Sequence, residues 1–569
     1  MKCLPLRTLC VLAVALGAAV SRLPAVERAA IAFDHFEYTG SDTVFDRPLP
    51  AAHFRNPILA GFYPDPSICR VGDDYYLINS TFAYFPGIPI FHSRDLVNWK
   101  QIGHVIDRPT QMNYDGVGVT RGIFAPAISH HNGTFYLVCT MIDKGGNFLM
   151  TATNPAGPWS DPIWLKFDGI DPSLFFDTDG RAWMLNNGNP PDNKPLYEGH
   201  RAIWLQEFDL QSRTLIGPRS IIVNGGADIT TKPVWIEGPH LYLRGGWYYL
   251  CCAEGGTSDR HSQVILRSKS VAGPFVPWEK NPILTQRDLD GTAPHAVTCT
   301  GHADLVEGPD GNWWSVFLAC RPYAGNQFAT GRETFLLPVT WTADGWPRIL
   351  PAGERVPYVV PSPKTMSGAA EVLAPTAKPL DPLNGNFTWR DDFGSSTLSP
   401  LWIMLRQPHE TWWNLNNGTL QLTPRPDVLS GKTNPTFLAR RLQHSIFNVV
   451  TSLTPPAENG VSAGLVVFQS EAHHYYFGVR RTAEGLTVFL ERLNGPKPEI
   501  VATTPLTKSS SLSLRLIGNE KNFAFAYATT DGIWHDVVAN ADSSAVTVQA
   551  AGGGLHFTGA VVGLHARVE

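Results

Sequence analysis

The sequence has few charged residues and no excess of positive charge. Only 17% of its 569 residues are Asp, Glu, Lys or Arg, and the formal net charge at pH 7 is -5. A typical soluble domain has about 25% charged residues. A protein that binds nucleic acid through its phosphates needs a strongly basic surface. The composition therefore argues against nucleic acid as a partner.

Long hydrophobic runs are also missing, apart from one at the start of the chain. Residues 9–20 are apolar, follow Lys2 and Arg7, and end among small residues. Because this run is too short to span a bilayer, residues 1–20 are predicted to be a secretory signal peptide. No later run reaches 18 apolar residues. We therefore expect the mature protein to be secreted or periplasmic, with no contact with a membrane once the signal is removed.

Cysteine is scarce, and its spacing matches no zinc site. Removing Cys3 and Cys10 with the signal leaves six of the eight cysteines, of which Cys251 and Cys252 are adjacent in a strand-like run. Disulfides can form in an exported protein, but a core of this size does not require them. We expect buried thiols and no metal site.

Glycine, proline and aromatic residues are abundant. The chain has 51 Gly, 46 Pro, 17 Trp, 16 Tyr and 29 Phe. This mixture is typical of short aromatic strands joined by many tight turns. It predicts an all-β protein.

A repeated segment organises the first two thirds of the chain. In each copy a short apolar strand is followed by a turn containing Gly and by a second aromatic or aliphatic strand. The copies begin at residues 65, 125, 171, 237 and 301. Separations of 60, 46, 66 and 64 residues suit a four-stranded blade with variable loops. Residues 51–355 are therefore predicted to form a five-bladed β-propeller.

The rest of the chain divides at a stretch rich in proline. Residues 356–388 are interrupted by Pro357, Pro361, Pro363 and further prolines, so we interpret them as a connector. Residues 389–569 return to alternating strands and are predicted to form a β-sandwich. Residues 21–50 are interpreted as an N-terminal lead-in to the propeller.

Three acidic residues occupy the position that opens a blade. The first strand of each propeller blade lines the central channel, so Asp65, Asp171 and Glu237 are expected to converge there. Hydrolysis of a glycosidic bond with inversion needs one protonated and one ionised carboxyl group. A third carboxylate can raise the pKa of the acid. A single Asp-Pro more often caps a turn, but three acids in phase favour a catalytic site.

The segments around these acids resemble a known family. They are similar to the three signature segments of glycoside hydrolase family 43, and further matching segments extend the resemblance over nearly the whole mature chain. The C-terminal part is similar to the sandwich of the family's β-xylosidase-like members, which implies a concanavalin A-like β-sandwich. The three signatures are Phe62-Tyr63-Pro64-Asp65-Pro66-Ser67-Ile68, Gly169-Ile170-Asp171-Pro172-Ser173-Leu174 and Ile236-Glu237-Gly238-Pro239-His240-Leu241-Tyr242.

The resemblance implies an inverting, exo-acting enzyme. Asp65 would be the general base, Glu237 the general acid, and Asp171 the residue that tunes and orients the acid. Four further residues would bind the substrate: Phe82, Phe124, His302 and Arg332. Each has a plainer alternative, because Phe82 is equally an ordinary core residue, Arg332 a surface partner of Glu333, and His302 a hydrogen-bonded core histidine.

The chemistry of two carboxyl groups requires no cofactor. In some members of the family, a histidine at the position of His302 helps to hold a structural calcium ion in the propeller channel, but one histidine does not make a metal site. The expected partner is an oligosaccharide or polysaccharide. The sequence carries no signal for an oligomeric state.

Two departures from the family pattern affect the choice of sugar. Phe124 stands where relatives usually have Trp, and Val561 stands where they have Phe in Phe-Thr-Gly-Ala-Phe-Val-Gly. Val561 cannot stack on a sugar, so the aromatic lid over the pocket is predicted to be lost or redesigned. We hypothesise release of terminal β-D-xylose or α-L-arabinofuranose from xylan or arabinoxylan fragments. The alternatives are a retaining fructan- or sucrose-type propeller glycosidase and a non-catalytic sugar-binding propeller.

Overall fold

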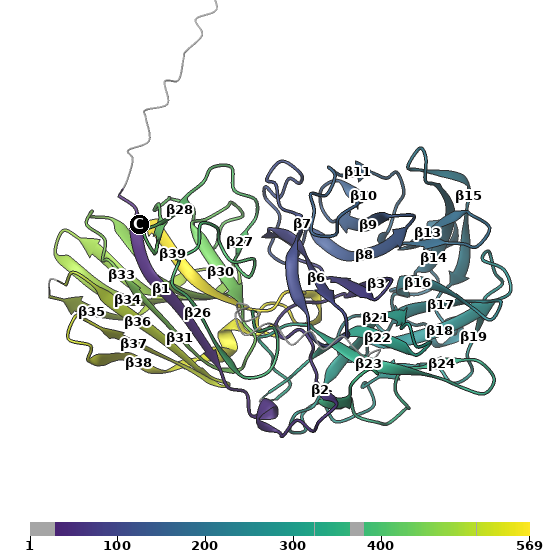
Figure 1. The fold of residues 1–569 in the computed structure, drawn as a ribbon. Helices are drawn as coiled ribbons and strands as arrows, with labels where there is room; N and C mark the ends of the chain where they lie inside the picture. Colours follow the sequence, from purple (N-terminus) through teal and green to yellow (C-terminus); the bar gives the residue numbers. More distant parts are fainter. Residues whose placement is uncertain (1–28, 324, 365–380, 508) are drawn as a thin grey trace, which may run out of the picture.

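The computed structural model describes residues 29–323, 325–364, 381–507 and 509–569. Within these ranges the chain forms a propeller, on the right of Figure 1, and a sandwich on the left. The predicted signal peptide and residues 365–380 of the predicted connector lie outside the described residues. None of the described helices has the length and apolar character needed to cross a membrane.

The propeller consists of five antiparallel sheets with at least four strands each. The first strands form a closed ring, in which β3 contacts β8, β8 contacts β12, β12 contacts β16, β16 contacts β21 and β21 contacts β3. The five-bladed arrangement predicted from the repeat is confirmed. The blades are β3 (Ser67–Val71), β4 (Asp74–Ile78), β6 (Gly87–Ser93) and β7 (Lys100–Ile106); β8 (Ile123–His131), β9 (Thr134–Met141), β10 (Gly146–Ala152) and β11 (Ile163–Trp164); β12 (Ile170–Phe176), β13 (Ala182–Gly188), β14 (Ala202–Asp209) and β15 (Thr214–Asn224); β16 (Glu237–Arg244), β17 (Trp247–Glu254), β18 (Ser262–Ser268), β19 (Val276–Pro277) and β20 (Leu284–Thr285); and β21 (Thr298–Glu307), β22 (Trp313–Cys320), β23 (Glu333–Trp341) and β24 (Pro347–Arg348).

Aromatic side chains join neighbouring blades. Trp313 of β22 meets Tyr242 of β16 edge to face, with ring centroids 5.8 Å apart, and meets Trp341 of β23 at 5.5 Å. Edge-to-face contacts of this kind add stability beyond the area that they bury. The aromatic content of the sequence therefore holds the ring of blades together.

The sandwich is built from two large sheets. Among the described residues each sheet has eight strands, and several short elements lie outside both sheets. One sheet is β28 (Trp413–Asn416), β29 (Thr419–Leu422), β1 (Ile31–Gly40), β31 (Ile446–Leu453), β36 (Leu512–Asn519), β37 (Asn522–Ala528) and β38 (Trp534–Asp542), with β26 (Phe387–Asp391) on β1; the other is β35 (Pro498–Leu506), β34 (Gly485–Asn494), β33 (His473–Thr482), β32 (Val461–Ser470), β39 (Val561–Val568), β30 (Phe437–Arg441), β27 (Ile403–Leu405) and β5 (Tyr84–Phe85); β2 (His53–Arg55) pairs with β25 (Val359–Pro361), and the 3-10 helices are η1 (Thr43–Asp46), η2 (Pro191–Asn193), η3 (Ile229–Thr231), η4 (Ser543–Val546) and η5 (Gly553–Leu555).

Strand β1 comes from the range that the sequence assigned to a lead-in, yet it lies inside a sheet of the sandwich. In Figure 1 it is the purple strand among the green strands. It pairs antiparallel with β31, where Tyr38 faces Val449. Phe33, Phe36 and Tyr38 are fully buried in the sandwich core. The start of the described chain therefore belongs to the C-terminal domain.

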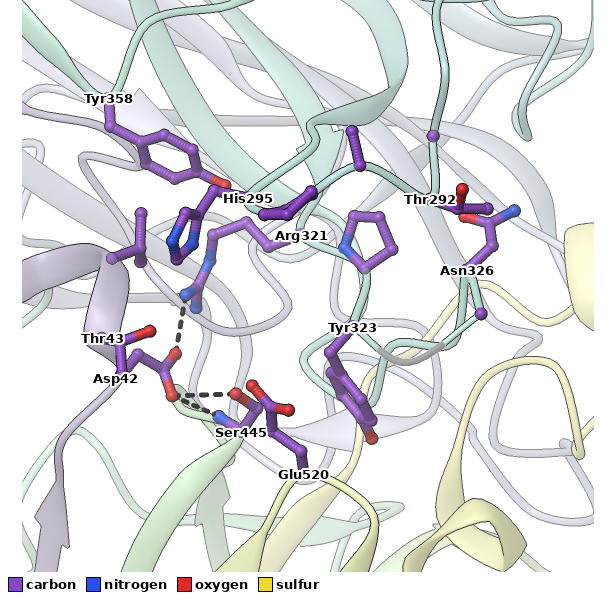
Figure 2. A pocket seen from close by; sticks show the side chains of 16 residues that line it. Asp42, Thr43, Thr292, His295, Arg321, Tyr323, Asn326, Tyr358, Ser445 and Glu520 are labelled. Carbon is purple, nitrogen blue, oxygen red and sulfur yellow. Dashed lines mark hydrogen bonds and ion pairs between the residues drawn. The ribbon is translucent and has the colours of Figure 1, made fainter.

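The two domains are joined by backbone pairing and by a buried ion network. Strand β5 leaves the first blade and pairs with β27, with Phe85 opposite Met404. Asp42 accepts hydrogen bonds from Arg321 of the propeller at 2.7 Å and from the backbone N–H of Ser445 of the sandwich at 2.8 Å (Figure 2). The guanidinium of Arg321 also binds both carboxylate oxygens of Glu333, at 2.6 and 2.9 Å.

Replacing Arg321 with Ala is expected to lower the free energy of unfolding by about 3–5 kcal/mol, because the carboxylates of Asp42 and Glu333 would stay buried without their cation. Urea unfolding followed by fluorescence measures this loss. Arg181→Ala is the matched control, since its ion pair with Asp179 is exposed and exposed ion pairs add little to stability. Equal losses in the two variants would contradict the assigned role of the network.

Candidate active site

The first strands of the blades begin irregularly, and this irregularity directs side chains into the channel. The register of β12 shifts between Ile170 and Ser173, and that of β16 shifts between Glu237 and His240. Such bulges re-aim side chains at the rim of a sheet. Asp65, Asp171 and His302 also have left-handed backbone angles, with φ of 50°, 52° and 51°. Strained conformations of this kind persist where the surrounding structure fixes them, often at functional sites.

A cavity of about 240 Å³ lies at the point where these strands begin. All seven residues that the sequence predicted for the site line it. Nine further residues complete the wall, and two of these, Leu555 and Phe557, come from the sandwich. The full lining is Asp65, Phe82, Arg121, Phe124, Ala125, Ile170, Asp171, Asn187, Arg201, Trp235, Glu237, Thr257, His302, Arg332, Leu555 and Phe557.

Asp65 is held in its ionised form. Its Oδ2 accepts a 2.6 Å hydrogen bond from the hydroxyl of Ser80, and its Oδ1 accepts one of 3.0 Å from Arg332. Burial by itself would raise the pKa of Asp65, but the charge of Arg332, together with His302 and the bond from Ser80, holds this pKa below its usual value. A buried carboxylate of low pKa is suited to act as a general base.

The pKa values of Asp171 and Glu237 are shifted upward, opposite to that of Asp65. Burial, followed by the charge of Asp65, raises the pKa of Asp171 to about 7. Burial is also the largest cause of a pKa well above the usual value at Glu237, and the charges of Asp171 and Asp65 raise it further. Glu237 therefore keeps its proton to higher pH than Asp65 does. Two carboxyl groups with pKa values displaced in opposite directions have the properties of an acid and base pair.

Replacing Asp171 with Asn is expected to move the basic limb of the pH profile of kcat/KM to lower pH. The variant removes a negative charge beside Glu237, so the pKa of Glu237 falls and its proton is lost at lower pH. The measurement is kcat/KM against pH for both proteins. Asp179→Asn, a change on the exposed outer part of the same blade, should leave both limbs in place. A basic limb that stays fixed in Asp171→Asn would exclude this tuning role.

Arg332 links the base to the sandwich. Its Nη1 donates to Asp65 Oδ1 at 3.0 Å and to Thr257 Oγ1 at 2.9 Å, and its Nη2 donates to the carbonyl oxygen of Phe557 at 3.2 Å. The alternative of an ion pair with Glu333 is not found, because Glu333 binds Arg321. Arg332 is thus placed to orient the base and to contact a bound ligand.

Aromatic rings form one wall of the cavity. The ring of Phe82 lies 5.5 Å from that of Phe124, edge to face, and is stacked on that of Phe557 at 6.1 Å. The guanidinium of Arg332 lies 5.3 Å from the centre of the Phe557 ring. Phe82 and Phe124 therefore face the cavity, as predicted from the sequence.

The aromatic lid from the sandwich is present, although Val561 does not supply it. Val561 is fully buried in β39, packed in a cluster with Phe62 and Tyr84. Phe557, four residues earlier, lines the cavity instead. The sandwich therefore supplies an aromatic ring to the pocket from Phe557 and not from position 561.

Two glycines bring Phe557 to the propeller. A Cβ added to Gly331 would lie 2.6 Å from the backbone N of Gly559, and one added to Gly559 would lie 2.3 Å from the carbonyl oxygen of Thr330. The loops of the two domains touch backbone to backbone at this point, which side chains would prevent. Both glycines could have been noticed in the sequence, since Gly331 directly precedes Arg332 and Gly559 lies two residues after Phe557.

Several other residues at the site were missed by sequence reasoning. Ser80, which donates a hydrogen bond to Asp65, lies two residues before Phe82 and had no assigned role. Three more lining residues lie in loops between blade strands: Thr257, Arg201 and Trp235. The repeat does not predict which way the side chains of such loops point. Only the fold brings these loops to the cavity.

The surroundings of His302 do not provide a set of side-chain ligands for calcium. Burial lowers the pKa of His302 to about 4. Its ring lies against Gly238, where an added Cβ would approach the Cε1 atom to 2.9 Å. Across the ranges that the structure describes, no group of three or more His, Cys, Asp or Glu side chains could hold a metal ion, whereas calcium usually takes six to eight oxygen ligands.

Two family models match the chain. Residues 54–347 match the model described as glycosyl hydrolases family 43. Residues 390–568 match the model described as the β-xylosidase C-terminal concanavalin A-like domain. Both parts of the fold are therefore accounted for by the comparisons.

Individual relatives agree with these models. A xylosidase/arabinosidase of Butyrivibrio fibrisolvens is 42% identical over 74% of this chain and 78% of its own length. A non-reducing end α-L-arabinofuranosidase of Bacteroides ovatus is 36% identical over 90% of this chain and 91% of its own length. The crystal structure of a GH43_12 protein retrieved from a capybara gut metagenome superimposes with a TM-score of 0.87, at 41% identity, over 95% of this chain and 100% of that one.

Proposed function

The chain belongs to glycosyl hydrolase family 43, an inverting family, and is a glycoside hydrolase; we propose that it releases terminal pentoses, β-D-xylose or α-L-arabinofuranose, from xylan or arabinoxylan fragments. The observation that carries this proposal is the cavity in which an ionised Asp65, a protonated Glu237 and three phenylalanine rings meet. Relatives named as xylosidases and arabinofuranosidases support the choice of sugar.

In the proposed reaction Glu237 gives its proton to the leaving oxygen. Asp65 takes a proton from a water molecule, which attacks the anomeric carbon from the opposite face of the sugar. Ser80 and Arg332 hold the carboxylate of Asp65 in place through both of its oxygens. Asp171 keeps the pKa of Glu237 high, so that the acid is protonated when the substrate binds. No step needs a cofactor, and we propose that none is used.

The size of the cavity supports attack at the end of a chain. Its volume of about 240 Å³ lies below the roughly 300–1,000 Å³ of pockets that hold drug-sized ligands. Phe557 and Leu555 of the sandwich cover one side of it. A single sugar residue fits such a space, while a polysaccharide running through it would be blocked. The enzyme is therefore proposed to remove one residue at a time.

The experiment that tests the sugar preference uses paired chromogenic substrates, a β-D-xyloside and an α-L-arabinofuranoside, with Glu237→Ala as the blank. We expect turnover of at least one substrate that exceeds the blank by about 10²-fold or more. No acid-dependent turnover of either would refute the pentose assignment. Such a result would turn attention to another terminal sugar or to a propeller that binds without cutting.

Proton NMR of the first-formed sugar tests the stereochemistry in the same reaction. Inversion is expected, so a β-D-xyloside should first yield α-D-xylose. Retention would instead support the fructan-type mechanism, in which a carboxylate forms a covalent intermediate.

We also propose that the protein is exported. The apolar residues 9–20 that follow Lys2 and Arg7 support this. N-terminal sequencing of the protein recovered outside the cytoplasm would identify the cleavage site. A mature protein that begins at Met1 and stays in the cytoplasm would contradict export.

A further inference from the structure

Two cysteines of the fifth blade lie against each other. Cys299 is in β21 and Cys320 ends β22, in antiparallel register, with Thr298 opposite Cys320. The two side chains share a small buried cluster with Phe328 and Val548. The neighbouring Cys320 lowers the pKa of Cys299, while burial raises that of Cys320.

The other thiols are differently placed. Cys251 and Cys252 are adjacent in β17, but their side chains lie in two separate clusters, because neighbours along a strand point to opposite faces. Cys139 donates a hydrogen bond to the carbonyl oxygen of Phe124. All six cysteines of the described residues are free thiols, and five of them are buried. Among them, Cys299 and Cys320 share one small cluster and line the same cavity.

This pair borders a second cavity, which shares a wall with the active site. The cavity has a volume of about 250 Å³ and is lined by both cysteines. Thr257, Arg332 and Phe557 line this cavity and the catalytic one as well. A group added to one of these sulfurs would therefore occupy space beside the arginine that binds Asp65.

We propose that Cys299 and Cys320 are a redox pair that a small-molecule disulfide oxidises to an intramolecular disulfide. The thiolate of one cysteine attacks the sulfur of the oxidant and releases one small thiol, leaving a mixed disulfide. The second cysteine displaces the other small thiol. In total, one S–S bond forms in the protein and one breaks in the oxidant. The two thiol hydrogens and two electrons end on the two small thiols.

The two products have different consequences for the active site. The internal disulfide adds no atoms to the second cavity. Arg332 and Phe557 therefore keep their positions, and turnover is retained. A lasting mixed disulfide on Cys299 adds a group beside Arg332 and lowers turnover. The closeness of the two cysteines in one cluster therefore protects the enzyme, because Cys320 removes the added group.

The first test oxidises the folded, reduced protein with hydroxyethyl disulfide and then alkylates the remaining thiols. Mass spectrometry is expected to show the loss of two hydrogens, four alkylated cysteines in the mature chain, and a peptide that joins Cys299 to Cys320. Cys252→Ser is the matched control and should form the same crosslink. Six alkylated cysteines, or a crosslink between other residues, would overturn the proposal.

The second test uses Cys320→Ser, in which the internal disulfide cannot form. The same oxidant is expected to leave a stable hydroxyethylthio group on Cys299 and to lower turnover several-fold, with recovery in dithiothreitol. Wild type should keep its turnover within twofold under the same treatment. A thermal unfolding curve of each reduced variant checks that it is folded. A folded Cys320→Ser that carries the group with unchanged turnover would refute the link to the active site.

Discussion

Hydrolysis of a xylo- or arabino-oligosaccharide is expected to slow by about 10³–10⁴-fold when Glu237 is replaced by Gln, the upper part of the range for loss of a general acid. Gln keeps the shape of the side chain but cannot give a proton to the leaving oxygen. The raised pKa of Glu237 shows why the native residue can do so at neutral pH. Initial rates with wild type and variant at equal concentration measure the effect.

A substrate with a better leaving group provides the control for this experiment. A dinitrophenolate departs without protonation, so the loss in Glu237→Gln should be far smaller with a dinitrophenyl glycoside. Glu254→Gln is the matched variant, because Glu254 is also a carboxyl group of the fourth blade whose pKa is raised by burial. It does not line the cavity and should retain turnover within a few-fold. A Glu237→Gln enzyme of similar activity would rule out the assigned acid.

Replacing Asp65 with Asn is expected to lower kcat by about 10³-fold or more with every leaving group, because water can no longer lose its proton as it attacks. The independence from the leaving group separates a base from an acid. Azide needs no base, so added azide should restore turnover and yield a glycosyl azide of inverted configuration. This product is identified by NMR and mass spectrometry.

Asp177→Asn is the corresponding control. Asp177 is a buried aspartate of the third blade that accepts hydrogen bonds from Tyr248, away from the cavity. It should retain kcat within a few-fold. If Asp65→Asn lost activity only with poor leaving groups, or if azide gave no product, Asp65 would not be the base.

Much of the propeller was predictable because its information is local. Each blade repeats a strand, a turn and a strand, so the phase of the repeat placed Asp65, Asp171 and Glu237 at equivalent positions in three blades before any contact was known. All three line one cavity in the structure. The family resemblance added Phe82, Phe124, His302 and Arg332, which line it as well.

Contacts between distant segments were not predictable in this way. Strand β1 alternates like many edge strands, and nothing near it in sequence identifies β31 as its partner. Phe557 belongs to a motif that was noticed, but the motif alone does not tell which of its side chains points out of the sandwich. Likewise, the contact between Cys299 and Cys320 depends on the bulge in β21. Such features follow from packing and not from periodicity.

The position of β1 has a consequence for biosynthesis. A nascent chain emerges from its amino end, so β1 leaves the ribosome before any of the strands that flank it in the sandwich, and the whole propeller is made in between. Domains generally fold as units during synthesis, yet this sandwich must wait until both ends of the chain are available. Phe557 then reaches the cavity last. A polypeptide that does not yet include Phe557 therefore has an incomplete pocket.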